Sequence, residues 1–122
     1  MAIIGNSRLR HVTRLSAADR DRILDFLQGA VYCWCKNKER TDWFSLRNLM
    51  GGENFFWAGT PLIALWQKHN GRSRNPVKSA GIDGGWLLKR VIVNDRRTFQ
   101  TRSAPSQIRE YRWDSTVPVS HE

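Results

Sequence analysis

The stretch Trp86-Leu-Leu-Lys-Arg-Val-Ile-Val93 decides the fold, because its pattern fits either a helix or a strand. As a helix from Asp83 it separates two arcs: Leu87, Leu88, Val91 and Ile92 on one, and Trp86, Lys89, Arg90 and Val93 on the other. As a strand, each face would be apolar with one long charged side chain in the middle. Gly84 and Gly85 argue against the helix, since each costs about 1 kcal/mol in a helix interior, and Asn94-Asp95-Arg96-Arg97 suits a hairpin turn. The better separation of polarity leads us to predict a helix over 83–93.

A β-hairpin is predicted directly after this stretch. Residues 98–102 alternate like a strand, Ser103-Ala-Pro-Ser106 has the composition of a turn, and residues 108–113 alternate again. In the second strand Ile108, Glu110 and Arg112 share one face, and Arg109, Tyr111 and Trp113 share the other. We therefore expect a hairpin over 98–113 with arginines along it.

Three helices are predicted before this region. Ser16-Ala-Ala-Asp19 resembles a capping box and opens a helix at about 17–36, whose apolar face holds Ile23, Leu27, Ala30, Val31 and Trp34. Trp43-Phe44 suits a brief strand, and residues 45–50 suit a short helix that Gly51-Gly52 ends. Thr60-Pro61 predicts a third helix over 61–69, with His69 as a packed or capping histidine. Residues 70–79 are predicted to form a basic loop.

The chain has the length and composition of one domain. It has 122 residues, of which 40% are hydrophobic, with six Trp and five Phe, enough to bury one core. We divide it into a basic N-terminal arm over 1–15 (flexible, or a short edge strand), a single domain over 16–113 and a flexible tail over 114–122. The N-terminal apolar segment is too short for a signal-peptide core and no apolar run would span a bilayer. A cytoplasmic location and no membrane partner are therefore expected.

Positive charge is concentrated in the C-terminal half of the chain. The net charge is +9, and residues 68–112 carry eleven basic and three acidic side chains, whereas residues 16–67 carry six of each. Residues 1–15 add three arginines and no acid. A neutral part beside a strongly basic part is typical of proteins that bind a polyanion. Nucleic acid is the expected partner, and the sequence leaves a homodimer or a protein partner open.

The order of these elements resembles the winged-helix superfamily, in which a helix-turn-helix is followed by a two-stranded wing. The resemblance lies in the segment from Trp57-Ala-Gly-Thr-Pro-Leu62 to Tyr111-Arg-Trp113. This segment is similar to the winged-helix modules of phage and plasmid replication proteins. The fold class that it implies is α+β, with a long N-terminal helix, a helix-turn-helix core and a C-terminal hairpin. It also implies duplex DNA binding, with one helix in the major groove and the wing on the backbone.

Ten residues of the basic half are candidate nucleic-acid contacts. Lys and Arg neutralise phosphates, Arg also pairs with guanine edges, and Trp stacks on bases. The helix over 83–93 would present Lys89 and Arg90 opposite the core, and Arg102 and Arg109 would flank the turn of the hairpin. The full set is Arg72, Arg74, Lys78, Trp86, Lys89, Arg90, Arg96, Arg97, Arg102 and Arg109.

The sequence carries no recognisable catalytic motif. It lacks a phosphate-binding loop, a nucleophile elbow and a zinc-ligand pattern, and its carboxylates are scattered. Cys33 and Cys35 are predicted to be reduced thiols without a metal. We therefore expect a protein that is not an enzyme and takes no cofactor. The alternative is a protein-interaction or inhibitor module on the same scaffold, perhaps phage-encoded, with Gly51–Trp57 as its contact segment.

Overall fold

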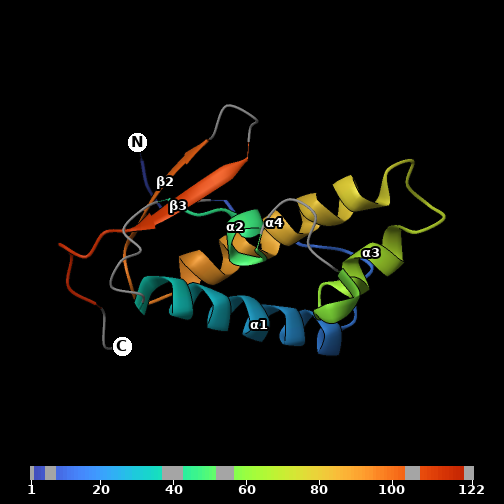
Figure 1. Cartoon of the computed structure of the whole chain (residues 1–122), viewed down its shortest axis with the longest axis horizontal. Coiled ribbons are helices and arrows are strands. Elements are labelled where there is room, and N and C mark those ends of the chain that lie inside the picture. Colours follow the sequence, from blue (N-terminus) through green and yellow to red (C-terminus); the bar gives the residue numbers. More distant parts are fainter. Residues whose placement is uncertain (1, 5–7, 37–42, 52–56, 104–107, 120–122) are drawn as a thin grey trace.

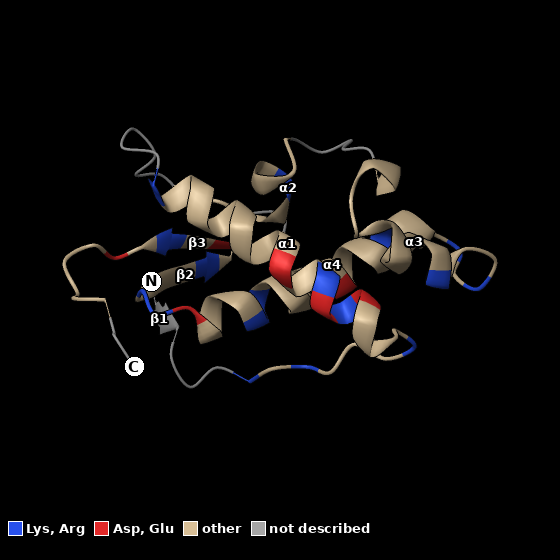
Figure 2. Ribbon diagram, turned by 90° about the horizontal axis from the view of Figure 1, so that it is seen from below, with Lys and Arg blue, Asp and Glu red and all other residues tan. Residues whose placement is uncertain are grey.

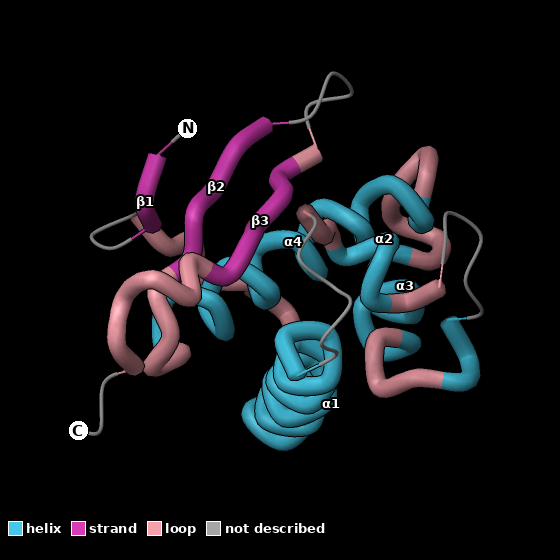
Figure 3. The backbone as a smooth tube through the Cα atoms, turned by 60° about the vertical axis from the view of Figure 1, so that its left-hand side comes forward, coloured by secondary structure: helices cyan, strands magenta, loops and turns pink. Residues whose placement is uncertain are grey.

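The computed structural model describes the whole chain except residues 1, 5–7, 37–42, 52–56, 104–107 and 120–122. The described part is an α+β fold in which helices lie on one side of a small antiparallel sheet (Figures 1 and 3). In chain order, the elements are β1 (Ala2–Ile4), α1 (Ala17–Lys36), α2 (Leu46–Leu49), the 3-10 helix η1 (Trp57–Gly59), α3 (Ile63–His69), α4 (Pro76–Asn94), β2 (Phe99–Ser103) and β3 (Arg109–Trp113). The α+β class predicted from the sequence is confirmed.

Helix α1 has the bounds that the sequence predicts. The hydroxyl of Ser16 accepts a hydrogen bond from the backbone N–H of Asp19 at 3.1 Å, which satisfies one of the free donors of the first turn. Ile23, Leu27 and Val31 recur at helical spacing and are completely buried. This stripe fixes which side of α1 faces the core.

Helix α4 is confirmed as a helix, but it begins seven residues earlier than predicted. Asn75 caps it by accepting a hydrogen bond from the N–H of Lys78 at 3.2 Å, and Pro76 occupies the first turn. Residues 76–79, predicted as loop, are thus the first turn of the helix, and the loop is confined to 70–75. The Asn-Pro pair is a helix-start signal, which the sequence analysis took for turn composition. Asn94 ends α4, and residues 95–97 lead into β2 instead of forming a hairpin turn.

The short elements between α1 and α4 start close to the predicted positions. Ser45 and Asn48 form a complete capping box at α2, and Gly51 follows it with a φ of +95°, the left-handed conformation that glycine adopts readily. Helix α3 begins at Ile63, two residues after the predicted start. The hydroxyl oxygen of Thr60 accepts a 3.0 Å hydrogen bond from the backbone N–H of Leu62, which forms a turn before the helix.

Helices α1 and α4 run side by side in the same direction, with their C-terminal ends toward the sheet and α3 at the other end (Figure 1). No described helix combines the length and apolar composition that a bilayer crossing requires.

The sheet has the order β1-β2-β3, and all its pairings are antiparallel. The predicted hairpin is confirmed, with Thr101 opposite Tyr111 and Ser103 opposite Arg109. Residues 2–4 form a short edge strand, one of the two alternatives predicted for the N-terminal segment, and Ile3 pairs with Gln100. Phe44 adds an isolated bridge to the other edge through Tyr111, where the sequence predicted a brief strand.

Phe44 lies at the centre of the core, between the helices and the sheet. It is completely buried, and its ring lies 5.5 Å from that of Trp34, 6.2 Å from Phe99 and 6.1 Å from Tyr111. Its backbone N–H and C=O each form a 2.8 Å hydrogen bond with Tyr111. One residue thereby sets the position of β3 relative to α1.

Within residues 8–15, Val12 and Thr13 contact the helices. Val12 is 3% exposed and belongs to the core, and its carbonyl accepts a 2.7 Å hydrogen bond from Arg20. The carbonyl of Thr13 accepts another from Lys68 of α3 at 2.5 Å. In the predicted tail, Asp114 donates its N–H to the carbonyl of Thr98 at 2.8 Å.

The glycines of α4 provide a matched test of this packing. A Cβ on Gly84 would lie 2.8 Å from Cδ2 of Leu46, whereas a Cβ on Gly85 meets nothing within 4 Å. We expect Gly85→Ala to stabilise the fold by about 0.5–1 kcal/mol through helix propensity. Gly84→Ala gains the same propensity but forces Leu46 to move, and such overpacking costs about 1–3 kcal/mol. Urea denaturation should place Gly84→Ala below Gly85→Ala in stability; equal midpoints would contradict the packing of α2 on α4.

Candidate nucleic-acid interface

The loop between α3 and α4 presents exposed basic side chains next to the beginning of α4. Gly71, with a φ of +80°, turns the chain after α3. A 2.7 Å hydrogen bond between the hydroxyls of Ser73 and Ser79 fastens the loop to the first turns of α4. Three of the predicted site residues, Arg72, Arg74 and Lys78, are exposed here. Figure 2 shows the basic residues of this loop at the end of the molecule formed by α3.

One side of α4 faces away from the core. Lys78, Ile82, Gly85, Trp86 and Lys89 recur at intervals of three and four residues, which places them along one face. Ile82 is 50% exposed, whereas the opposite side of the helix holds the buried Leu87 and Val91. Trp86 is partly buried and packs against the core, and the ammonium group of Lys89 lies 5.2 Å from the centre of its ring. The predicted outward position of Lys89 agrees with this arrangement.

Arg109, at the beginning of β3, places a positive charge within electrostatic reach of Lys89 on α4. Burial of its ammonium group, and then the positive charge of Arg109, lower the pKa of Lys89. Arg109 also faces Tyr111, whose pKa burial raises to about 12. The charge of Arg109 thus acts on side chains of both α4 and β3.

Arg102 lies on the other face of the hairpin, which corrects the prediction that it acts beside Arg109. Successive side chains of a strand point to opposite faces, and Arg109 is paired with Ser103, the neighbour of Arg102. The guanidinium of Arg102 pairs with the carboxylate of Glu110 at 2.9 Å and lies 4.2 Å from the ring centre of Trp43. Arg112 covers the same ring at 4.7 Å. Arg102 is thus part of a stacked cluster on the outer side of the sheet.

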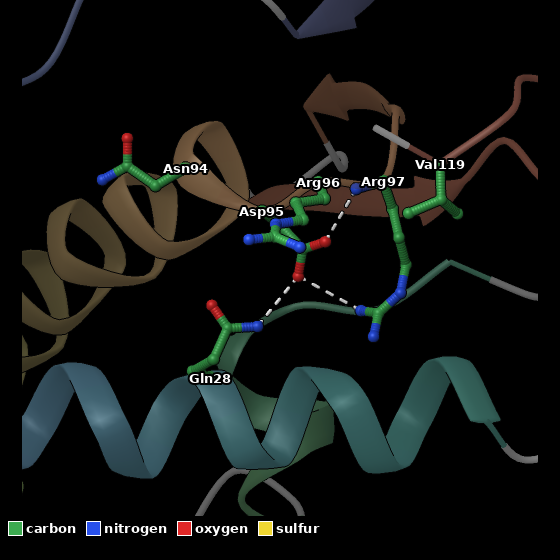
Figure 4. Close-up of a pocket in the computed structure, with 6 residues that line it drawn as sticks. All are labelled: Gln28, Asn94, Asp95, Arg96, Arg97 and Val119. Atoms are coloured by element: carbon green, nitrogen blue, oxygen red, sulfur yellow. Dashed lines mark hydrogen bonds and ion pairs between the residues drawn. The ribbon is translucent and has the colours of Figure 1, made fainter. Parts of the chain in front are cut away.

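Arg97 is also held within the fold. Its guanidinium forms a 3.1 Å ion pair with Asp95 and lies between the rings of Tyr32 and Trp113, at 5.5 and 5.6 Å from their centres. Asp95 in turn accepts a 2.8 Å hydrogen bond from the amide of Gln28 on α1 (Figure 4). These contacts fasten the link between α4 and β2 to α1, and they occupy the charged groups of both residues.

A cavity of about 320 Å³ lies beside this cluster and is lined by Gln28, Asn94, Asp95, Arg96, Arg97 and Val119 (Figure 4). Arg96 is exposed and lines this cavity just after the C-terminal end of α4, whereas Lys78 lies in the first turn of that helix. Arg90 is partly buried, and no carboxylate in the described ranges pairs with it. The structure therefore gathers Arg72, Arg74 and Lys78 at one end of α4, and Lys89 lies toward the other end, within electrostatic reach of Arg109.

A three-residue cluster that the sequence analysis missed joins α3 to α4. The carboxylate of Asp83 lies 2.7 Å from Nζ of Lys68 and 2.7 Å from Nε2 of His69. The expectation that His69 packs within the fold agrees with this contact. The two partners of Asp83 lie fourteen and fifteen residues before it, too far for a helical spacing to indicate the contact. The cluster fixes the angle between the two helices.

The remaining groups considered in the sequence do not gather into a catalytic site. Within the described ranges, no three side chains of the His, Cys, Asp and Glu types come together as a metal site would require. Cys33 is exposed, Cys35 is buried, and both are free thiols. Of the segment 51–57, proposed as a protein contact, residues 52–56 lie outside the described residues, and Trp57 is partly buried against the core.

Searches of protein-family models, curated proteins and solved structures give no match to this chain.

The two thiols should differ sharply in reactivity. Burial raises the pKa of Cys35 to about 11, so at pH 8 almost none of it is thiolate, the reactive form. We expect a thiol reagent such as Ellman's reagent to modify Cys33 rapidly at pH 8 and Cys35 only after unfolding. The Cys33→Ser variant should lose the rapid phase. Two equivalents released at one rate in the native protein would contradict the burial of Cys35.

Proposed function

We propose that this chain binds double-stranded DNA through the outer face of α4, the loop 70–75 before it and Arg109, the first residue of β3. The observation that carries the proposal is the group of exposed basic side chains, Arg72, Arg74 and Lys78, at the beginning of α4, with Lys89 further along the same helix face. Phosphates of the DNA backbone are anions that such a row of cations would bind.

The spacing of the basic groups supports a duplex as the ligand. Lys78 and Lys89 are eleven residues apart on α4, and a helix rises 1.5 Å per residue, so about 16 Å separates them. The major groove of B-DNA is about 12 Å wide and admits an α-helix. A helix lying in the groove would reach one strand's phosphates with Lys78 and the loop arginines, and the other strand's with Lys89 and Arg109.

The order of the elements favours a winged-helix arrangement for this binding. Helix α3, the loop and α4 would be the helix-turn-helix, and β2 with β3 the wing. The bridge between Phe44 and Tyr111 supports this interpretation, because it places Phe44, just before α2, on the edge of the hairpin. In that arrangement α4 is the recognition helix and Arg109 contacts the backbone.

The proposal is one of binding without catalysis. Asp83, Asp95 and Glu110, the acidic residues of α4, the linker after it and β3, are each occupied by an ion pair. A protein-interaction module stays the second candidate, and the exposure of Val77 and Ile82 on α4, at 52% and 50%, favours it. The two candidates differ in their response to salt, since an apolar contact is not weakened by counterions.

Duplex binding should depend steeply on salt. If five cations (Arg72, Arg74, Lys78, Lys89 and Arg109) each neutralise a phosphate, the logarithm of the affinity should fall with the logarithm of salt concentration at a slope of about −4 to −5. Fluorescence anisotropy with a labelled 20-base-pair duplex measures it. A slope near zero, or no binding with about 10 μM duplex at about 50 mM salt, would contradict DNA binding and favour the protein-interaction module.

Two arginines of the same hairpin provide a matched comparison. Arg109→Ala should weaken binding to all DNA sequences about equally and flatten the salt slope by about one unit. The double variant with Lys89→Ala and Arg109→Ala should flatten the slope by about two units. Arg102→Ala should have little effect, because Arg102 lies on the opposite face and is paired with Glu110.

The control on α1 is Arg22→Ala, since Arg22 is exposed, whereas Arg20 supports the carbonyl of Val12. Anisotropy and a thermal melt of each variant separate binding from folding. If Arg102→Ala or Arg22→Ala harms binding as much as Arg109→Ala does, the proposed surface is wrong.

A further inference from the structure

The outer face of α4 changes character between its two basic ends. Ile82 is 50% exposed in this middle part, and Gly81 and Gly85 flank it. A Cβ added to either glycine meets nothing within 4 Å, so the backbone there is open to close approach. An exposed isoleucine between two glycines gives the helix an apolar contact point at its centre.

The polar side chains of α4 nearest to this point are occupied within the fold. Asp83 holds Lys68 and His69, and the hydroxyl of Ser79 is bonded to that of Ser73 at 2.7 Å. Hydrogen bonds to base edges would therefore have to come from the ends of the helix. The centre of the helix offers only apolar contact to whatever lies against it.

We propose that Ile82 contacts the C5-methyl group of thymine in the major groove, so that the protein prefers duplexes that carry this methyl group. The inference rests on the proposed DNA binding, because the basic residues at both ends of the face are what place a duplex across it. In the major groove, the methyl group distinguishes thymine from the other bases and is recognised by apolar side chains. The missing Cβ atoms of Gly81 and Gly85 leave room for the base edges beside Ile82.

Deoxyuridine tests this contact, since it lacks only the methyl group and keeps the charge and base pairing of thymidine. The probes are an alternating d(AT) duplex of 20 base pairs and the same duplex with every thymidine replaced by deoxyuridine, both titrated with the full chain. Burial of one or two methyl-sized groups corresponds to roughly three- to tenfold in affinity. We expect the wild type to bind the deoxyuridine duplex weaker by that factor.

The Ile82→Ala variant completes the comparison. It should bind the thymidine duplex as weakly as the wild type binds the deoxyuridine duplex, and it should not distinguish the two probes. Val77→Ala is the matched control: Val77 is 52% exposed on the same helix but lies about 140° around it. This variant should keep the wild-type preference. Circular dichroism verifies that both variants fold.

The possible failures are distinguishable. Equal binding of the wild type to both duplexes, with a steep salt dependence, overturns the methyl contact and leaves DNA binding in place. A preference that persists in Ile82→Ala assigns the methyl contact to another residue and also overturns the inference. Absence of binding to either duplex removes the proposed function and this inference with it.

Discussion

The packing of Phe44 is the interaction on which the rest of the structure depends. Its ring fills the space between Trp34 of α1, Phe99 of β2 and Tyr111 of β3, and its backbone pairs with that of Tyr111. Removal of a buried aromatic ring of this kind typically costs about 3–5 kcal/mol, comparable with the whole stability of a small domain. Because Phe44 lies two residues before the start of α2 and contacts both α1 and the hairpin, it holds the two halves of the fold in one relative position.

That position determines the basic surface. Tyr111 is buried in the core, and Arg109, two residues before it on the same face of β3, lies within electrostatic reach of Lys89 on α4. The ion pair of Asp83 with Lys68 ties the first half of α4 to α3, and Asp95, directly after α4, accepts a hydrogen bond from Gln28 of α1. Two carboxylates, Asp83 and Asp95, thus hold α4 in place, and the exposed cations Arg72, Arg74 and Lys78 lie at its beginning.

Local signals were sufficient for most of the secondary structure. Ser16 and the stripe of Ile23, Leu27 and Val31 determine α1 by themselves, and the alternation on either side of residues 103–106 determines the hairpin. The prediction places the start of α4 too late, because Gly84 and Gly85 argue against a longer helix while Asn75-Pro76 has the composition of a turn as well as of a helix cap. Gly84 is explained only by tertiary packing against Leu46, which no local pattern reveals.

The candidate site was predictable only in part, because it depends on register. A shift of one residue in strand pairing exchanges the two faces of a hairpin, and the length of the turn did not specify which arginines would share a face. The structure separates Arg102 from Arg109 for this reason. It likewise removes Arg97 from the candidate site, since its partners Asp95, Tyr32 and Trp113 come together only in three dimensions.

The most direct test of the account maps the contact surface residue by residue. A titration of the ¹⁵N-labelled protein with an unlabelled duplex of 16 base pairs, followed by amide chemical shifts, reports which backbone groups sense the DNA. The account predicts that the largest changes lie in residues 72–75, on the outer face of α4 from Lys78 to Lys89, and at Arg109. Changes concentrated on α1 or around Trp43 and Arg102, or no changes at a saturating duplex concentration, would contradict it.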